Sequence, residues 1–169
     1  MNQFGICHLS TITVRAEASH RTELVTQLLF GETYQVIAQS EDEEWLHIQT
    51  DYDQYKGWIP AFQHYQVSEQ YYTDYQLNKH SVLTQSIAEL QHPSLGRHLL
   101  SAGSVLPFFR DGVIRLGEEE LKIAQPTDKP SLEAFAKQYL LTPYLWGGRS
   151  IFGIDCSGFV QQVFRAIAG

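Results

Sequence analysis

The stretch Asp-Cys-Ser-Gly-Phe-Val at residues 155–160 decides how the chain is interpreted, because it places a cysteine just before an apolar run with helical spacing. Asp155 is predicted to cap a helix that begins at about Cys156. A helix N-terminus favours a cysteine thiolate through its free backbone N–H groups and its macrodipole, and the thiolate is the form that attacks carbonyl groups. The stretch therefore indicates a cysteine nucleophile, against the alternative of a free cysteine buried in a helix.

A cysteine nucleophile usually works with a histidine base, and the histidines of this chain are unusually placed. All seven lie before Cys156 and none follows it: His8, His20, His47, His64, His80, His92 and His98. The sequence therefore looks like an enzyme that stops just after its nucleophile, with the catalytic histidine absent. Cys7 is predicted to be a buried structural thiol; a disulfide between Cys7 and Cys156 stays open, and it would silence the nucleophile.

The composition excludes several classes of function. Of the 169 residues, 43% are hydrophobic and 18% are charged, which is typical of a globular protein and not of a disordered one. The formal net charge of −7 argues against a sequence-independent nucleic-acid binder and against adsorption to an anionic membrane. The histidines show no metal-ligand spacing, so we expect neither a metal nor a cofactor.

The sequence also lacks the marks of a membrane or secreted protein. No stretch approaches the roughly 18 apolar residues that suggest a membrane span. Residues 1–8 lack the basic and apolar regions of a secretory signal. We therefore expect a cytoplasmic protein, or a periplasmic one if a leader was removed.

Short strands and turns fill the first two thirds of the chain. Residues 1–66 show alternating patterns rich in β-branched and aromatic residues, which predict a first small β barrel. Residues 67–127 predict a second β module, in which Asp111-Gly112 is a hairpin signal between residues 105–109 and 113–116. Residues 78–90 allow a short helix or irregular strands. Several tyrosines are expected to pack between the modules: Tyr65, Tyr71, Tyr72 and Tyr75.

The pattern becomes helical after a polar, proline-containing linker at residues 125–130. Apolar residues spaced as on one helix face follow Ser131, which is placed to cap the helix, and Pro143 is expected to end it. A second amphipathic helix is predicted to begin at about Cys156. Its apolar residues are Phe159, Val160, Val163, Phe164 and Ile167.

Two groups of motifs carry a family resemblance. Pro-Tyr-Leu-Trp-Gly-Gly at residues 143–148, followed eight residues later by Cys156 in its own motif, resembles the NlpC/P60 cysteine peptidases of bacterial cell walls. Residues 14–17, 27–32 and 55–59 resemble a bacterial SH3 (SH3b) domain. The order of the motifs resembles the YkfC-like subgroup, in which two SH3b modules precede the peptidase.

The resemblance implies a domain organisation. Residues 1–66 would be SH3b domain 1, residues 67–127 an SH3b-like domain 2, and residues 128–169 the N-terminal portion of the peptidase domain. The fold class implied is all-β small barrels followed by the helical part of an α+β, papain-like NlpC/P60 domain. Family members place the catalytic histidine on a sheet after the nucleophile helix, and that sheet also covers the apolar face of the helix.

The resemblance also implies an activity and a set of site residues. Such enzymes cleave the γ-D-glutamyl to diamino-acid bond of peptidoglycan stem peptides (L-Ala-γ-D-Glu-diamino acid). Cys156 matches the nucleophile, and Tyr144 matches a tyrosine whose hydroxyl helps to orient the scissile carbonyl. Asp155 and Ser157 match the pair that lines the substrate site, where the aspartate helps to bind the free amine of L-Ala. Tyr55 is the best match to an SH3b tyrosine that closes the same pocket.

Three functional interpretations follow. In the first, the parent protein is a peptidase that recycles muropeptides, and this chain is inactive alone. In the second, the chain is a binding module for wall peptides that does no chemistry. In the third, it is half of a split enzyme, and a second chain supplies the missing part of the peptidase.

Overall fold

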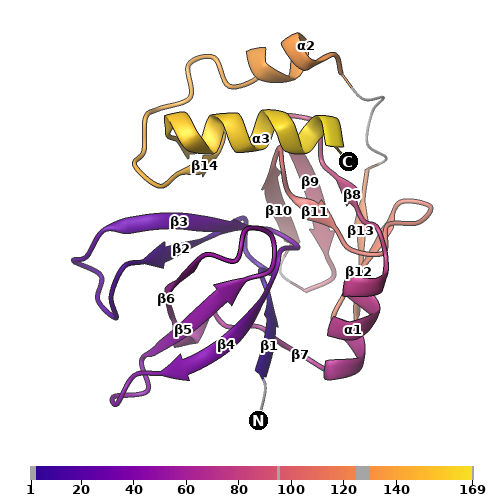
Figure 1. Ribbon diagram of the computed structural model, residues 1–169. Coiled ribbons are helices and arrows are strands. Elements are labelled where there is room, and N and C mark those ends of the chain that lie inside the picture. The colour runs from indigo at the N-terminus through magenta and orange to yellow at the C-terminus, as the bar shows by residue number, and fades with distance from the viewer. Residues whose placement is uncertain (1–2, 95, 125–129, 169) are drawn as a thin grey trace.

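The computed structural model describes residues 3–94, 96–124 and 130–168 and shows two β modules beneath a group of helices (Figure 1). The predicted order, β modules followed by a mostly helical C-terminal part, is confirmed by the element order. No helix within these residues is long and apolar enough to cross a membrane.

The first module is a seven-stranded antiparallel sheet with the order β3-β2-β6-β5-β4-β1-β7. Alternation along the chain buries Ile12 and Val14 and leaves the polar residues between them at the other face. Register shifts after Val14 and after Val36 bend the sheet, and β3 and β7 form its edges. The elements are β1 (Gln3–Ile6), β2 (Thr11–Arg15), β3 (Leu24–Leu29), β4 (Thr33–Gln39), β5 (Trp45–Thr50), β6 (Lys56–Pro60), η1 (Ala61–Gln63) and β7 (Gln66–Val67).

The second module combines a four-stranded sheet, with the order β10-β9-β13-β12, and the two-stranded pair β11-β8. The predicted Asp111-Gly112 turn is present: both residues have positive φ, and Arg110 and Val113 exchange backbone hydrogen bonds. The predicted hairpin across it is short: Arg110 and Val113 form an antiparallel bridge and the N–H of Arg115 donates to the carbonyl of Pro107, while β11 pairs with β8 and β12 pairs with β13. The strands are β8 (Ser81–Val82), β9 (Ile87–His92), β10 (Gly96–Ser101), β11 (Val105–Leu106), β12 (Val113–Leu116) and β13 (Glu119–Ile123).

Helix α1 (Glu69–Leu77) lies in the tyrosine-rich stretch, before the region in which the sequence allowed a helix. It begins where the Ser68 hydroxyl accepts a hydrogen bond from the backbone N–H of Tyr71, at 3.1 Å. The sequence of this helix has no clear apolar period, because Tyr71 and the adjacent Tyr72 are both buried. Residues 78–90 contain β8 and the first part of β9, so strands and not a helix form there.

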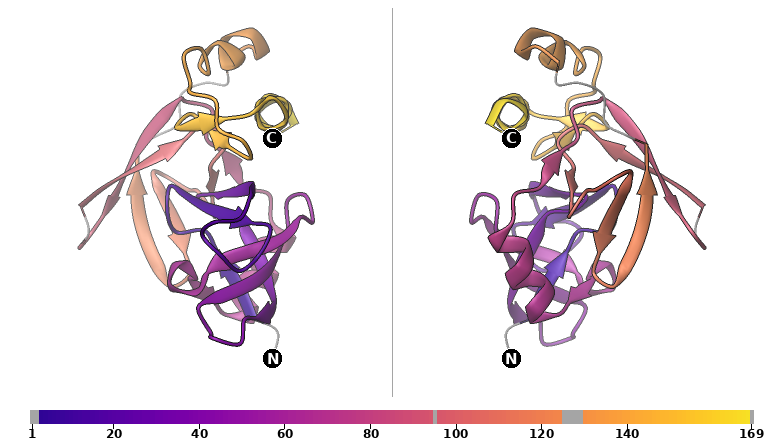
Figure 2. Two further views of the ribbon diagram at one scale, coloured as in Figure 1. Left: turned by 90° about the vertical axis from the view of Figure 1, so that its left-hand side faces the viewer. Right: turned by 90° about the vertical axis from the view of Figure 1, so that its right-hand side faces the viewer.

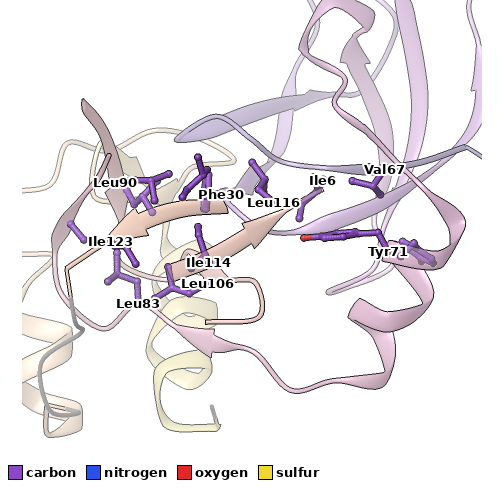
Figure 3. Close-up of a cluster of buried hydrophobic side chains, with 14 of the residues drawn as sticks. Ile6, Phe30, Val67, Tyr71, Leu83, Leu90, Leu106, Ile114, Leu116 and Ile123 are labelled. Carbon is purple, nitrogen blue, oxygen red and sulfur yellow. The ribbon is translucent and has the colours of Figure 1, made fainter. Parts of the chain in front are cut away.

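One hydrophobic core joins the two β modules (Figure 3). The first module contributes Phe4, Ile6 and Phe30 to it, and the second contributes residues such as Leu90 and Ile114. The four tyrosines expected to pack between the modules all belong to this cluster or pack against it. The modules are therefore not independent hydrophobic units. The domain boundary at residues 66–67 stays a prediction, and residues 125–129, which hold most of the linker and the second boundary, lie outside the described residues.

The C-terminal part contains α2 (Leu132–Lys137), β14 (Arg149–Ser150), β15 (Gly153–Ile154) and α3 (Cys156–Ala168). Ser131 caps α2 as predicted, by accepting a hydrogen bond from the N–H of Ala134 at 3.2 Å. The prediction that this helix continues to Pro143 is wrong. After Lys137 the backbone tightens into turns closed by bonds between residues three apart, and Leu141 has a φ of 67°.

Helix α3 begins at Cys156, as predicted, and lies between α2 and the β modules (Figure 2). Phe159 and Val163 pack against a small cluster that includes the buried Phe135 and Tyr139 of the α2 region. Other members of the predicted apolar face are not covered: Val160 is 50% exposed and Phe164 is 67% exposed.

Because Phe30 is fully buried in the shared core, we expect Phe30→Ala to lower the free energy of unfolding by about 3–5 kcal/mol. The unfolding curve should keep a single transition, since both modules share that core. Urea denaturation followed by circular dichroism measures both quantities.

The matched control is Phe62→Ala, because Phe62 is 79% exposed. Its effect should stay within about 0.5 kcal/mol. Two separate transitions, with Phe30→Ala affecting only one of them, would contradict the shared core.

Candidate active site

Cys156 is the first residue of α3, and its thiol is free and exposed. Cys7 is also free but fully buried, and burial raises the pKa of its thiol. The structure therefore excludes the disulfide that the sequence had left open. It leaves Cys156 as the one reagent-accessible cysteine of the two.

Asp155 caps α3 and ties it to the preceding turn. One carboxylate oxygen accepts hydrogen bonds from the N–H of Gly158 at 2.6 Å and from the hydroxyl of Ser157 at 2.7 Å, and the other accepts from the N–H of Gly147 at 2.9 Å. Burial opposes ionisation, but these hydrogen bonds outweigh it and lower the pKa of Asp155 below its ordinary value. The residue is therefore an anion that fixes both the helix start and the turn.

Glycines permit the close contacts around this cap. Gly147 has a φ of 74°, and a β-carbon there would lie 2.4 Å from the carbonyl oxygen of Leu24 in β3. A β-carbon on Gly158 would lie 2.2 Å from the carbonyl oxygen of Gly148. Only glycine fits these positions, so Gly147 lets its turn pack against the first module and Gly158 lets the start of α3 pack against that turn.

A pocket with a volume of about 300 Å³ opens beside Cys156. It brings together four of the five predicted site residues: Cys156, Asp155, Ser157 and Tyr55. Tyr55 comes from the first module, about a hundred residues before the helix in the chain. Tyr144, the fifth residue, does not line the pocket; its side chain is 68% exposed, while its backbone forms a parallel bridge to Ile154.

The sequence did not indicate several of the residues that line the pocket, above all two acidic ones from the first module. Glu23 and Asp53 both line the pocket, and Glu23 accepts a hydrogen bond from the indole N–H of Trp146 at 2.6 Å. Both carboxylates lie in polar turns that resemble any solvated turn, so no local signal marks them. Together with Asp155 they give the pocket an acidic wall, which favours a cationic group on a ligand.

Arg149 also lines the pocket, and its charge is balanced only in part, because it shares the carboxylate of Glu32 with Arg165. Its guanidinium forms a paired contact with the buried carboxylate of Glu32, with distances of 3.0 and 3.2 Å. Arg165 of α3 contacts the same carboxylate. Burial opposes the ionisation of Glu32, yet the two arginines outweigh it and lower the pKa of the carboxyl group. Tyr52 lies under both guanidinium groups, 5.0 and 4.3 Å from its ring centre.

We expect Asp155→Asn to destabilise the fold at pH 7 by about 1–3 kcal/mol, because an amide replaces an anion that accepts several hydrogen bonds. The folded-state pKa of Asp155 lies below its unfolded value, so its contribution is present above about pH 4 and is lost as the pH falls through the folded pKa. Urea titrations at pH 7 and pH 3 should show that the gap between wild type and variant narrows at pH 3.

Asp111→Asn serves as the control, because that side chain is 89% exposed. It should change the free energy of unfolding by less than about 0.5 kcal/mol at either pH. An Asp155→Asn gap of equal size at both pH values would show that the charge of Asp155 does not stabilise the fold.

Comparison with known proteins adds independent information. A γ-D-glutamyl-L-lysine dipeptidyl-peptidase of Bacillus subtilis (strain 168) is 29% identical over 163 residues, which cover 83% of this chain and 52% of that protein. Dipeptidyl-peptidase 6 of Lysinibacillus sphaericus is 27% identical over 184 residues, covering 88% of this chain and 64% of that protein. The chain thus spans about half to two thirds of the length of these relatives.

A solved structure shares the fold. An NlpC/P60 family protein from Bacillus cereus ATCC 10987 superposes with a TM-score of 0.77 at 18% identity, covering 96% of this chain and 72% of that one. Family models match two segments: the bacterial dipeptidyl-peptidase SH3 domain matches residues 14–63, and the NlpC/P60 family matches residues 141–169. The resemblance inferred from the sequence is therefore confirmed: a match to the bacterial dipeptidyl-peptidase SH3 domain precedes a match to the NlpC/P60 family.

Proposed function

We propose that this chain is part of a cysteine peptidase. The enzyme removes an N-terminal dipeptide from peptidoglycan stem peptides by hydrolysing the bond between γ-D-glutamate and the diamino acid. The observation that carries the proposal is the pocket itself. In it, the exposed Cys156 thiol at a helix start faces an acidic wall that the first β module supplies.

The proposed reaction is acyl transfer through Cys156. The sulfur attacks the γ-glutamyl carbonyl, the amine of the diamino acid leaves with a proton, and water then releases the dipeptide from the thioester. Backbone N–H groups at the start of α3 are suited to stabilise the oxyanion, and one such donor is typically worth roughly 3–4 kcal/mol. Tyr144 is proposed to assist at the carbonyl, which requires its exposed side chain to turn toward bound substrate.

The acidic wall explains why the product would be a dipeptide. A substrate with a free N-terminus carries an ammonium group, and Glu23 and Asp53 offer carboxylates to it, with Tyr55 beside them. Asp155 contributes its charge, although its oxygens already accept hydrogen bonds from its own helix start and turn. The names of the two curated relatives, both dipeptidyl-peptidases, support this assignment.

The general base is the least defined part of the proposal. Among the residues that the structure describes, those lining the pocket include no histidine. We propose that the base comes from outside this lining, either from further polypeptide of the same protein or from a second chain. The recycling role and the cytoplasmic location expected from the sequence belong to the same proposal.

The same observation favours a second candidate function, a binding module. An acidic pocket of about 300 Å³ can hold the amino end of a wall peptide without cleaving it. The two functions differ in whether Cys156 is needed for a chemical step.

Mass spectrometry of the products from L-Ala-γ-D-Glu-L-Lys and from its diaminopimelate counterpart tests the proposal. We expect the complete open reading frame that contains this chain to release L-Ala-γ-D-Glu, and Cys156→Ala to reduce release to the uncatalysed background. Acetylating the N-terminal amine should lower kcat/KM on the order of 100-fold, because an ammonium that pairs with the acidic wall is lost.

The 169-residue chain is assayed beside the complete reading frame. Cleavage by the longer protein only would support a base outside this chain. Cleavage by the chain itself, lost in Cys156→Ala, would support the peptidase and contradict the external base. Cleavage that survives Cys156→Ala would overturn the nucleophile. No cleavage by either form, with tripeptide binding retained, would favour the binding module.

A further inference from the structure

We propose that Glu32, a buried carboxylate of the first β module that does not line the pocket, positions the nucleophile helix by holding Arg149 and Arg165. The proposal rests on the function proposed for Cys156 but can be tested without turnover. Glu32 would be a positioning residue, because it acts through the two arginines and touches no substrate.

Glu32 is itself held firmly. It follows Gly31 in the turn between β3 and β4, and its side chain is 2% exposed. One oxygen accepts a hydrogen bond from the backbone N–H of Leu29 at 2.8 Å, within the same turn. The carboxylate is therefore a fixed point of the first module.

Arg149 connects the carboxylate of Glu32 to the wall of the pocket. Its guanidinium meets both oxygens of Glu32 and also donates to the carbonyl oxygen of Gln27 at 2.7 Å. Its backbone N–H donates to the side-chain oxygen of Gln27 at 2.9 Å. Arg149 follows directly on Gly147 and Gly148, which pack against β3 and the start of α3. The strand β14 is thereby attached to β3, next to the cap of the nucleophile helix.

Arg165 holds the C-terminal half of α3 to Glu32. It contacts the same carboxylate oxygen as Arg149, and its side chain is 9% exposed. Gln161, which lines the pocket, lies four residues before Arg165 and so on the same side of α3. Holding Arg165 opposes a rotation of α3 that would turn the pocket-lining residues and Cys156 away from the first module.

The charge of Glu32 is what this arrangement requires. Two guanidinium groups are buried against one carboxylate, so removing the negative charge leaves two cations facing each other in a dry site. Those cations would separate or draw in water, and either change would shift β14 and α3. A displacement of about 1 Å near reacting groups is enough to lower the rate on the order of 100-fold.

The test compares Glu32→Gln with a stability-matched control, Ile48→Ala, whose side chain is buried in the core of the first module away from α3. We expect Glu32→Gln, assayed well below its melting temperature in the complete reading frame, to lose on the order of 100-fold in kcat/KM. Ile48→Ala should lose stability but little activity. Glu32→Asp, which keeps the charge, should fall between wild type and Glu32→Gln.

Amide NMR spectra of the 169-residue chain give a readout that needs no turnover. The signals of Gly147, Arg149 and Gly158 should shift in Glu32→Gln and stay in place in Ile48→Ala. If neither variant moves these signals, or if both lose activity in proportion to stability, Glu32 is merely structural and the proposal fails. If wild type releases no dipeptide but the signals move as expected, the proposed function fails and the positioning role stands.

Arg165→Lys covers the case in which Glu32→Gln does not fold. It keeps the charge and leaves the paired contact between Arg149 and Glu32 intact. We expect a smaller shift of the Gly158 signal and about a 10-fold loss of activity. An unchanged spectrum and unchanged activity in Arg165→Lys would contradict a role for the second half of the cluster.

Discussion

The ion cluster of Glu32, Arg149 and Arg165 is the interaction on which the rest of the structure depends. Burying three charges carries a large desolvation cost, which is offset only when the geometry is good and further hydrogen bonds satisfy the remaining donors. Here the carboxylate comes from the first β module and both arginines come from the C-terminal part. The cluster therefore ties the C-terminal part, including α3, to the first β module beside the pocket.

Close backbone contacts at two glycines also fix the position of α3. At Gly147 and Gly158 the backbone approaches other backbone so closely that a single β-carbon would displace the helix start. Asp155 bridges the same two segments through its carboxylate. The first β module thus does more than precede the C-terminal segment in the chain. It supplies part of the pocket that Cys156 lines, through Glu23 and Tyr55, and the carboxylate of Glu32 that Arg165 of α3 contacts.

Local patterns in the sequence predicted local features of the structure. The start of α3 at Cys156, the caps at Asp155 and Ser131, and the turn at Asp111-Gly112 each depend on residues a few positions apart, and each was found. Features set by distant contacts were missed. Glu23, Asp53 and Glu32 look like ordinary polar turn residues, and their roles arise only because the fold places them against a segment more than ninety residues away. The end of α2 was also misplaced, because local backbone turns after Lys137 end the helix before Pro143.

The ion cluster is expected to make the first module and the start of α3 one rigid unit, which native-state hydrogen exchange measures most directly. The amide of Arg149 donates a hydrogen bond to Gln27 of the first module, and those of Gly147 and Gly158 donate to Asp155 close to this contact. The amide of Leu29 donates within the first module. If the two parts open together, all four should exchange with opening free energies within about 1 kcal/mol of one another. If the first three amides exchange with an opening free energy several kcal/mol lower than that of Leu29, the helix detaches on its own. The first module and α3 would then not be one rigid unit.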